Sequence, residues 1–501
     1  MRLRRRTLLL LMLSLLATIS VAPARAVTAA EDPFATSLEQ AVPELLAAYE
    51  VPGLTVAAIQ NGDVVWSKGF GYADTARQRP MTADHILMHG SNGKVITTWA
   101  VLRLVEEGKV DLDAPVQSYV KSWQLPPSPY PSRITVRKLL THTSGLAPKS
   151  YLPRDPRFPV VSILDSLNGR NYGSGPVVQA YEPGRGSHYS GAGFAVAQLL
   201  VEEVTGESFE AYTKRVIFEP LGMTTAAWHW TPAVIAQAAT PYDATGEPLP
   251  YYDLSEAAVG GEMMTAADFA RFVAAAVTGP NGEPPGRGVL KPETIAQALT
   301  PQPGDPSMGL GYGIDRMQNG KSFLMHRGAN PGWQAVFALQ PESGNGFVAV
   351  ANSDRADRLM TELIDLWSRA VEGTPLPLPA DWSRQVTDPW LPLRNLLTGL
   401  AALLGVGLIP VAYRVWSQTR RGTRRWGWSV TALVRAVLIT VLVAVWVIFF
   451  HTEIQIPWPP SWLFVHWPAE IRWVTLAVVA WASLGIVMGG LRPDKKDPGG
   501  P

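Results

Sequence analysis

Apolar and polar positions alternate with two different periods along the chain, and these periods distinguish helices from strands. Residues 33–49 have the spacing of an amphipathic helix. Residues 54–60 and 64–72 have strand patterns, and Asn61-Gly62-Asp63 between them contains the asparagine-glycine pair typical of a tight hairpin turn. A sheet is therefore predicted to begin with this hairpin.

The middle of the chain, from about 92 to 300, is predicted to be mostly helical, with loops rich in proline and glycine. Its predicted helices are 136–140, 193–205, 209–218 and 266–277. Strand patterns return at 323–326, 332–339 and 346–351, and a last helix follows at 358–371. This order predicts an α+β fold in which an antiparallel sheet from both chain ends is flanked by helices, with an inserted helical region and an active site at the seam.

A serine and a lysine lie three residues apart in the stretch 88–95, so on a helix they face the same way. A seryl hydroxyl is a poor nucleophile until a base takes its proton, and a buried, neutral amine can be that base. After Lys94 the apolar spacing of a buried helical face continues to Val105 and stops at Gly108. Ser91 is therefore predicted to open a core helix as a nucleophile with Lys94 as its base; the alternative is a helix-capping serine beside a solvated lysine.

Spacing alone does not identify such a site, because this pair arises by chance roughly once or twice in a chain of this length. Ser118 and Lys121 have the same spacing. They follow Pro115 in a stretch with no sustained helical period. We predict that Ser118 is not a nucleophile.

Composition excludes several classes of function. The formal net charge is only +1, and the basic residues are not gathered into a stripe on the folded region, so no nucleic-acid partner is expected. The chain has no cysteine, which excludes disulfides, cysteine nucleophiles and thiolate metal sites. No zinc signature or complete ligand set occurs, so neither a metal nor another cofactor is predicted.

The N-terminal residues 1–26 have the features of a secretory signal: arginines, an apolar run, and Ala24-Arg25-Ala26 as a cleavage site. An uncleaved anchor is the alternative. At the other end, a proline-rich linker is predicted at 373–394 before three apolar segments within 395–490 and a tail at 491–501.

The three apolar segments are 395–413, 430–450 and 472–490, and each is about long enough to cross a bilayer. The connection between the first two contains five arginines and no acid, so the positive-inside rule places it, and also the basic tail, in the cytoplasm. The prediction is a multi-pass protein of the cell membrane, with lipid around three helices and a folded domain, 31–372, on the extracytoplasmic side.

Two further stretches contain residue types that suit the same chemistry. Tyr189-Ser190-Gly191 is a turn that opens a helix, and a phenol beside a lysine can shuttle protons. His326-Arg327-Gly328 ends a strand, where glycine lets a substrate approach the backbone and a cation can stabilise negative charge. The stretch 142–145 is interpreted as a loop that supports the pocket.

These motifs, in this order, resemble the landmark series of the serine hydrolases that include class C β-lactamases, penicillin-binding proteins of the D-alanyl-D-alanine carboxypeptidase type and related esterases. The resemblance covers about 35–370 and rests on 91–94, 139–146, 189–191, 220–223 and 326–328. It implies that Ser91 is acylated, that Lys94 is its activating partner, and that Tyr189 relays protons to the leaving group and for the deacylating water.

The resemblance also implies a substrate-binding edge and an oxyanion hole. His326 and Gly328 match the histidine form of the family's third motif, and the backbone amides of Ser91 and Ala329 would form the oxyanion hole. Histidine in place of lysine reduces the fixed positive charge available to a substrate carboxylate. Arg327 is expected to point away from its neighbours on the strand.

One position departs from the family's pattern. Gly191 stands where the family often has an asparagine that holds a substrate amide carbonyl, which puts efficient β-lactam turnover in doubt. Glycine can alternatively be required by the backbone of a tight turn. Both interpretations keep Tyr189.

The leading hypothesis is a membrane-anchored hydrolase that forms an acyl-enzyme on Ser91, with a D-alanyl peptide, a D-alanyl or other small ester, or a β-lactam as its substrate. The alternative from another class is a non-catalytic receptor that binds cell-wall peptide or antibiotic. The presence of Ser91, Lys94 and Tyr189 together favours the enzyme.

Overall fold

The computed structural model describes residues 33–149, 151, 160–171, 175–378, 391–420, 424–426, 429–451 and 471–493. The predicted signal sequence, most of the predicted linker and all but the first residues of the predicted tail lie outside these ranges.

A seven-stranded antiparallel sheet forms the centre of the folded region, in the order β3-β2-β1-β9-β8-β7-β6. Its strands are β1 (Gly53–Gln60), β2 (Asp63–Asp74), β3 (Arg79–Pro80), β6 (Gly313–Arg316), β7 (Ser322–Asn330), β8 (Trp333–Gln340) and β9 (Asn345–Ala351). Strand β1 pairs directly with β9, with Val56 opposite Ala349. The prediction that both ends of the chain build one sheet is confirmed.

The turn between β1 and β2 follows from its sequence. Asn61 and Gly62 both have positive φ angles, 50° and 71°, and Gln60 pairs with Asp63 across them. A two-residue hairpin loop of this kind needs left-handed backbone at both positions, which asparagine and glycine adopt most readily.

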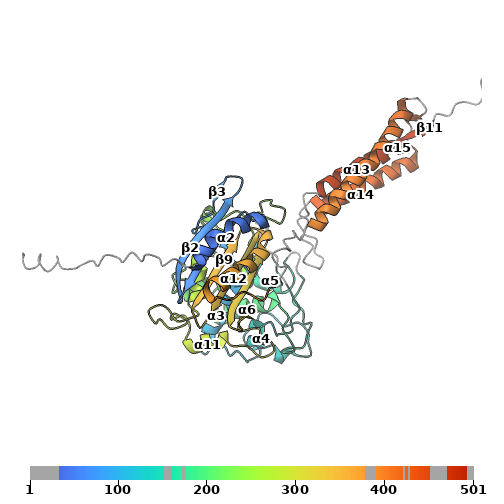
Figure 1. The fold of residues 1–501 in the computed structure, drawn as a ribbon. Coiled ribbons are helices and arrows are strands. Elements are labelled where there is room, and N and C mark those ends of the chain that lie inside the picture. Colours follow the sequence, from blue (N-terminus) through green and yellow to red (C-terminus); the bar gives the residue numbers. More distant parts are fainter. Residues whose placement is uncertain are drawn as a thin grey trace, which may run out of the picture.

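Two helices from opposite ends of the chain cover one face of the sheet. Helix α2 (Pro33–Tyr49) and helix α12 (Asp357–Glu372) lie side by side in Figure 1, blue beside orange. Their apolar sides pack with β1, β8 and β9 into one core, in which Phe34 and Trp367 are almost fully buried. Each helix therefore stabilises the sheet by burying one apolar face and leaving the other to solvent.

The opposite face is covered by the helical region inserted between the strands. Helix α10 (Ala266–Ala274) packs on the sheet, and α3 (Gly93–Glu106) and α6 (Gly191–Thr205) belong to the same large apolar core. The remaining helical elements are η2 (Gly90–Asn92), η3 (Val116–Ser118), η4 (Pro131–Arg133), α4 (Val136–Leu140), α5 (Ile163–Leu167), α7 (Phe209–Thr213), η5 (Lys214–Phe218), α8 (Pro232–Gln237), α9 (Ala257–Gly260), α11 (Pro292–Leu299) and η6 (Asp354–Ala356). A two-stranded ribbon, β4 (Leu87–Met88) with β5 (Met263–Met264), leads into the turn before α3.

Some element boundaries differ from the prediction. The helix predicted at 209–218 is α7 followed by the π-helical turn η5, and the helix predicted at 266–277 ends at Ala274. Strand β7 runs four residues beyond its predicted end at His326. Strand β6 was not predicted, because this short edge strand has no buried residue and hence no alternation of burial.

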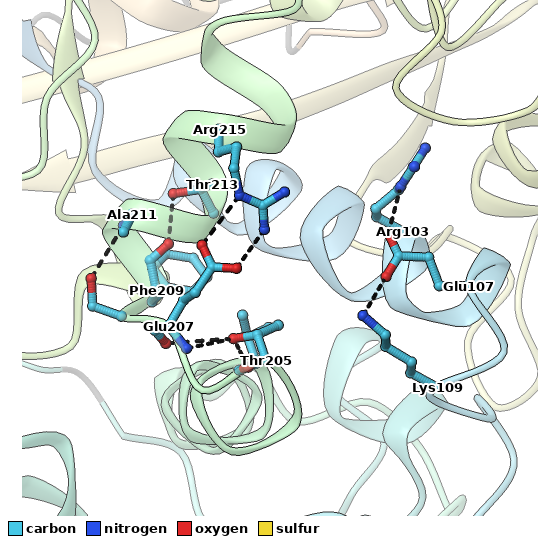
Figure 2. Close-up of polar contacts among 11 residues, drawn as sticks. Arg103, Glu107, Lys109, Thr205, Glu207, Phe209, Ala211, Thr213 and Arg215 are labelled. Atoms are coloured by element: carbon cyan, nitrogen blue, oxygen red, sulfur yellow. Dashed lines mark hydrogen bonds and ion pairs between the residues drawn. The ribbon is translucent and has the colours of Figure 1, made fainter.

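Ion pairs and hydrogen bonds lie near the ends of α3, α6 and α7, as Figure 2 shows. Beyond the end of α3, Glu107 accepts a hydrogen bond from Arg103 at 3.0 Å and pairs with Lys109 at 2.9 Å. Next to α7, Arg215 pairs with Glu207 at 2.5 Å. These partly exposed pairs each contribute little to stability, so the position of α3 is set mainly by its buried face.

The C-terminal part consists of three long helices, α13 (Leu391–Arg420), α14 (Val430–His451) and α15 (Ile471–Gly490), which lie side by side in Figure 1. The three predicted apolar segments are thus helical. Of the described residues, those at 396–417 form the one helix long and apolar enough to cross a membrane, with a mean hydropathy of 2.0, whereas α14 and α15 contain shorter apolar stretches at 432–443 and 473–488. Three membrane spans therefore remain a prediction.

Candidate active site

Ser91 lies in η2, the tight turn that leads directly into α3. The turn requires glycine at position 90, where φ is +60° and an added Cβ would lie 2.7 Å from the backbone nitrogen of Ala329. Ser91 itself is half-buried. The prediction placed Ser91 at the opening of the helix, and the structure places it in the preceding turn, two residues before Gly93.

Lys94 lies in the first turn of α3 and is 1% exposed. Its Nζ donates to Ser91 Oγ at 2.9 Å and to the carbonyl oxygen of Val259 at 2.6 Å. The same nitrogen lies 5.1 Å from the ring centroid of Tyr189 and 5.6 Å from that of Phe194. The amine is therefore held between the seryl oxygen and a backbone carbonyl, where it can exchange a proton with the hydroxyl.

Tyr189 lies at the open side of this group. Its side chain is 50% exposed, and its ring centroid lies 4.3 Å from that of His142 and 6.2 Å from that of His326. The hydroxyl makes no hydrogen bond to another described residue. The ring is thus next to Lys94, while the oxygen is free to reach a bound ligand.

The stretch 142–145 contacts the tyrosine through His142, whose ring packs against that of Tyr189. His142 holds a left-handed φ of 58°, uncommon outside glycine, and its Nδ1 accepts a hydrogen bond from the Ser190 amide at 3.2 Å. Because Nδ1 accepts, the proton of the neutral ring is on Nε2. Burial and then the charge of Lys94 hold the pKa of His142 well below 6.5. Ser190 Oγ caps α6 by accepting from the amide of Ala192.

Gly191 has no room for a side chain. An added Cβ would lie 2.8 Å from the carbonyl oxygen of Lys149 and 3.0 Å from both Tyr151 and Val259. Its φ is outside the left-handed region, so the requirement for glycine comes from close packing and not from the backbone of a turn. The interpretation that the backbone of a tight turn requires glycine at position 191 is therefore wrong, because close packing is what requires it.

Two neighbours on β7 point to opposite faces of the sheet. His326 is 7% exposed and faces the site, where Nδ1 donates to the Arg327 carbonyl oxygen at 2.7 Å. Burial and then the charge of Lys94 lower the pKa of His326 to about 3, so the ring is neutral at neutral pH. Arg327 instead donates to Asp357 at 3.2 Å and to Thr361 on α12. The expectation that Arg327 points away is confirmed.

Glycines bring the β7 backbone against the turn that contains Ser91. A Cβ on Gly328 would lie 1.8 Å from the carbonyl oxygen of His89 and 3.1 Å from the amide nitrogen of Ser91. A Cβ on Gly90, in the facing turn, would lie 2.7 Å from the amide nitrogen of Ala329. The two amides that the sequence assigned to an oxyanion hole thus border one tight backbone contact.

Comparison with known proteins identifies the family. A family model described as "Beta-lactamase" matches residues 38–371, which is more than half of the chain. The chain belongs to this family.

Several relatives of this β-lactamase-family protein have been described. The putative penicillin-binding protein PbpX of Bacillus subtilis is 32% identical over 232 residues, which are 45% of this chain and 55% of that protein. The chain thus spans about half the length of that relative. Protein flp of Staphylococcus aureus strain COL is 24% identical over 385 residues, covering 74% of this chain and 73% of the relative.

Solved structures share the fold. The octameric penicillin-binding protein homologue of Pyrococcus abyssi has a TM-score of 0.56 and 25% identity, over 67% of this chain and 76% of that one. The D-amino acid amidase of Ochrobactrum anthropi SV3 complexed with L-phenylalanine amide has a TM-score of 0.55 and 23% identity, over 68% and 99% of the two chains. Family and fold together indicate a serine hydrolase.

The structure separates the second serine-lysine pair from this β-lactamase-family site. Ser118 is exposed in η3, and Lys121 Nζ donates to the Gln117 carbonyl oxygen at 3.0 Å. In the part of the chain that the structure describes, no group of three or more histidine and carboxylate side chains is arranged to hold a metal.

Sequence reasoning missed one acidic residue at the site. Glu262 is 0% exposed, and its carboxyl lies against Gly93, where an added Cβ would be 1.9 Å from Oε2. The signal in the sequence was an acid directly before the buried strand β5, a place where an unpaired carboxyl is costly. Val259, whose carbonyl holds Lys94, carried no signal, because a backbone acceptor does not depend on residue type.

Proposed function

We propose that this protein is a membrane-anchored serine hydrolase that forms an acyl-enzyme on Ser91, acting on D-alanyl esters, amides or peptides of the cell envelope. The observation that carries the proposal is the 2.9 Å contact between Lys94 Nζ and Ser91 Oγ, made by a lysine that is 1% exposed. A buried amine at hydrogen-bond distance from a half-exposed hydroxyl is the arrangement that activates a seryl nucleophile.

The proposed reaction follows from these positions. Lys94 takes the Ser91 proton while Oγ bonds to the substrate carbonyl carbon, and the amides of Ser91 and Ala329 stabilise the oxyanion. The bond to the leaving group then breaks as the leaving group receives a proton from the Lys94 ammonium through the Tyr189 hydroxyl. A water molecule next gives a proton to Lys94 along the same route and attacks the acyl carbon. The bond between that carbon and Ser91 Oγ then breaks as Lys94 returns a proton to Oγ.

Charges around the site favour substrates whose leaving group has no carboxylate. Position 191 is a glycine and offers no amide side chain. His326 is neutral, and Arg327 donates a hydrogen bond to Asp357 on α12. A C-terminal D-alanine or a β-lactam carboxylate would therefore lack a fixed cation beyond Lys94 among these residues. This supports D-alanyl esters or amides ahead of D-alanyl-D-alanine peptides and β-lactams.

The C-terminal helices are proposed to anchor the enzyme in lipid, with its catalytic domain outside the cell. The apolar helix at 396–417 supports an anchor. Backbone pairing of β10 (Arg424–Trp426) with β11 (Leu491–Pro493) supports the orientation, because it puts the arginine-rich connection and the basic tail at the same end of the helices. The linker and the domain division at 372 remain part of this proposal.

The test uses the full chain purified in detergent. A fluorophosphonate probe should label the wild type and Ser118→Ala, and intact mass should show one adduct that is absent from Ser91→Ala. Steady-state turnover of a chromogenic ester, a D-alanyl amide, a D-alanyl-D-alanine peptide and a chromogenic cephalosporin should rank the first two ahead.

Equal labelling of the two serine variants would show that Ser91 is not the nucleophile. No turnover of any of the four substrates, with Ser91→Ala binding a fluorescent penicillin as the wild type does, would replace the enzyme by a receptor. Preferred turnover of the peptide or the cephalosporin would overturn the substrate class alone.

A further inference from the structure

The carboxyl group of Glu262 is buried against the first residue of α3, next to Lys94 in the sequence of that helix. Glu262 follows Gly260, the last residue of α9, and its capping residue Gly261. The carbonyl oxygen of Glu262 accepts a hydrogen bond from the His89 amide at 3.2 Å, at the end of the β4–β5 ribbon. Glu262 is 0% exposed, and neither carboxyl oxygen has a hydrogen bond of ordinary geometry with another described residue. An unpartnered buried carboxyl is costly, so its retention here calls for a role.

The carboxyl occupies the space that a side chain at position 93 would need. A Cβ built on Gly93 would lie 1.9 Å from Oε2, 2.4 Å from Cδ and 2.8 Å from Oε1. Gly93 is the first residue of the 14-residue helix α3, whose free amides give its start a positive potential. The acid therefore sits at the positive end of the helix that holds Lys94 in its first turn.

Lys94 is the charged group that acts on this carboxyl. Burial raises the pKa of Glu262 well above 4.5, and its own backbone amide, then the charge of Lys94 and then the amide of Gly93 act in the opposite direction. The histidine facing Glu262 across the ribbon is neutral, because burial lowers the pKa of His89 to about 4. Around Lys94, the histidines at 142 and 326 are also neutral at neutral pH, and Tyr189 is the remaining titratable neighbour.

We propose, on the basis of the function proposed above, that Glu262 is a positioning residue for acylation: its buried carboxylate, set against the first residue of α3 and without direct contact to the Lys94 amine, stabilises through space the ammonium that Lys94 becomes when it takes the Ser91 proton. The carboxylate lies off the proton route from Ser91 through Lys94 and Tyr189, and it neither gains nor loses a proton in the step.

Replacing Glu262 with glutamine keeps the shape and removes the charge, which has two opposite consequences. Without a carboxylate, Lys94 is less stabilised as an ammonium, so the neutral amine exists at lower pH. The amine is also a weaker base, since its ammonium form has lost a partner in the transition state. Glu262→Gln should therefore react faster than the wild type at low pH and more slowly at high pH, so that the two plots of rate against pH cross.

The experiment measures the rate of fluorophosphonate labelling at Ser91 from pH 5 to 10 in the full chain in detergent. For Glu262→Gln we expect the half-maximal pH to fall by about one unit or more, and the rate at high pH to fall about tenfold. The matched control is Glu256→Gln, because Glu256 is an equally buried glutamate whose partners are Ser166 and Asn171. Its half-maximal pH should equal that of the wild type.

A Glu262→Gln profile parallel to the wild type, or lowered equally at every pH together with the thermal midpoint, would reduce Glu262 to a packing role and overturn the inference alone. If Glu262→Gln does not fold, Glu262→Asp and Glu262→Met are compared. Only the aspartate should keep the wild-type half-maximal pH, and equal values would overturn the inference. Absence of labelling in the wild type would instead overturn the proposed function and this inference with it.

Discussion

Introducing at position 191 the asparagine that the resemblance led us to expect there should destabilise this protein. In Gly191→Asn the new Cβ would lie 2.8 Å from the Lys149 carbonyl oxygen and 3.0 Å from both Tyr151 and Val259. The backbone of Lys149 cannot move away without loss, because its carbonyl oxygen accepts a hydrogen bond from the Gly191 amide at 2.7 Å. Overpacking of this kind costs about 1–3 kcal/mol of unfolding free energy. Movement of Val259 would also displace the carbonyl that holds Lys94.

The assay is the thermal midpoint of the full chain in detergent together with turnover of a chromogenic ester and a cephalosporin. The expected loss corresponds to a fall of roughly 2–4 °C per kcal/mol in domains of 150–250 residues, and somewhat less in a larger one. Gly191→Ala should show part of the loss, because the contact begins at Cβ. Gly175→Ala is the control, since nothing lies within 4 Å of its added Cβ. An unchanged midpoint with faster cephalosporin turnover in Gly191→Asn would refute the packing argument.

Further predictions concern the proton relay and the buried histidines. Tyr189→Phe should lower ester turnover by about two to four powers of ten while leaving the thermal midpoint unchanged, because its hydroxyl has no described partner; turnover within a few fold of wild type would remove it from the mechanism. Lys94→Met should lower the labelling rate of Ser91 by about two powers of ten or more, and normal labelling would contradict its role as base. Burial depresses the pKa of His89 to about 4 and of His326 to about 3, against 6.5 ordinarily. The unfolded chain therefore binds more protons below pH 6.5, and stability should fall toward pH 4 by about 1.4 kcal/mol per pH unit for each histidine. His89→Gln should flatten that slope, measured by denaturant midpoints, and an unchanged slope would show that His89 is charged in the folded protein.

Local patterns were sufficient to predict most elements of the fold. The hairpin over 54–72 was predictable because its turn needs left-handed backbone at Asn61 and Gly62, and the helix at 33–49 because one of its faces is apolar. The pairing of β1 with β9 was inferred only from the order of elements, and it holds. Edge strand β6 escaped prediction because none of its side chains is buried.

The site was predictable where its residues are near neighbours in sequence or belong to an ordered motif. Ser91 and Lys94 meet because of helical spacing, and the structure places the Tyr189 ring beside that amine and His326 beside the same ring. Glu262 was not predictable in this way, since its closeness to Gly93 comes from a ribbon that joins segments about 170 residues apart. The contact between Gly93 and Glu262 therefore has no local signature in the sequence.

The two-residue period of β7 keeps the arginine of this strand out of the candidate active site. His326 and Arg327 are adjacent, so a strand must send one to the pocket and the other to α12. Because Gly328 has to meet the nucleophile turn without a side chain, the register is fixed, and His326, two residues earlier, shares its face. Arg327 therefore bonds to Asp357 and Thr361, while the neutral imidazole of His326 faces the candidate site. A preference for substrates without a carboxylate would then follow from strand register as much as from residue type.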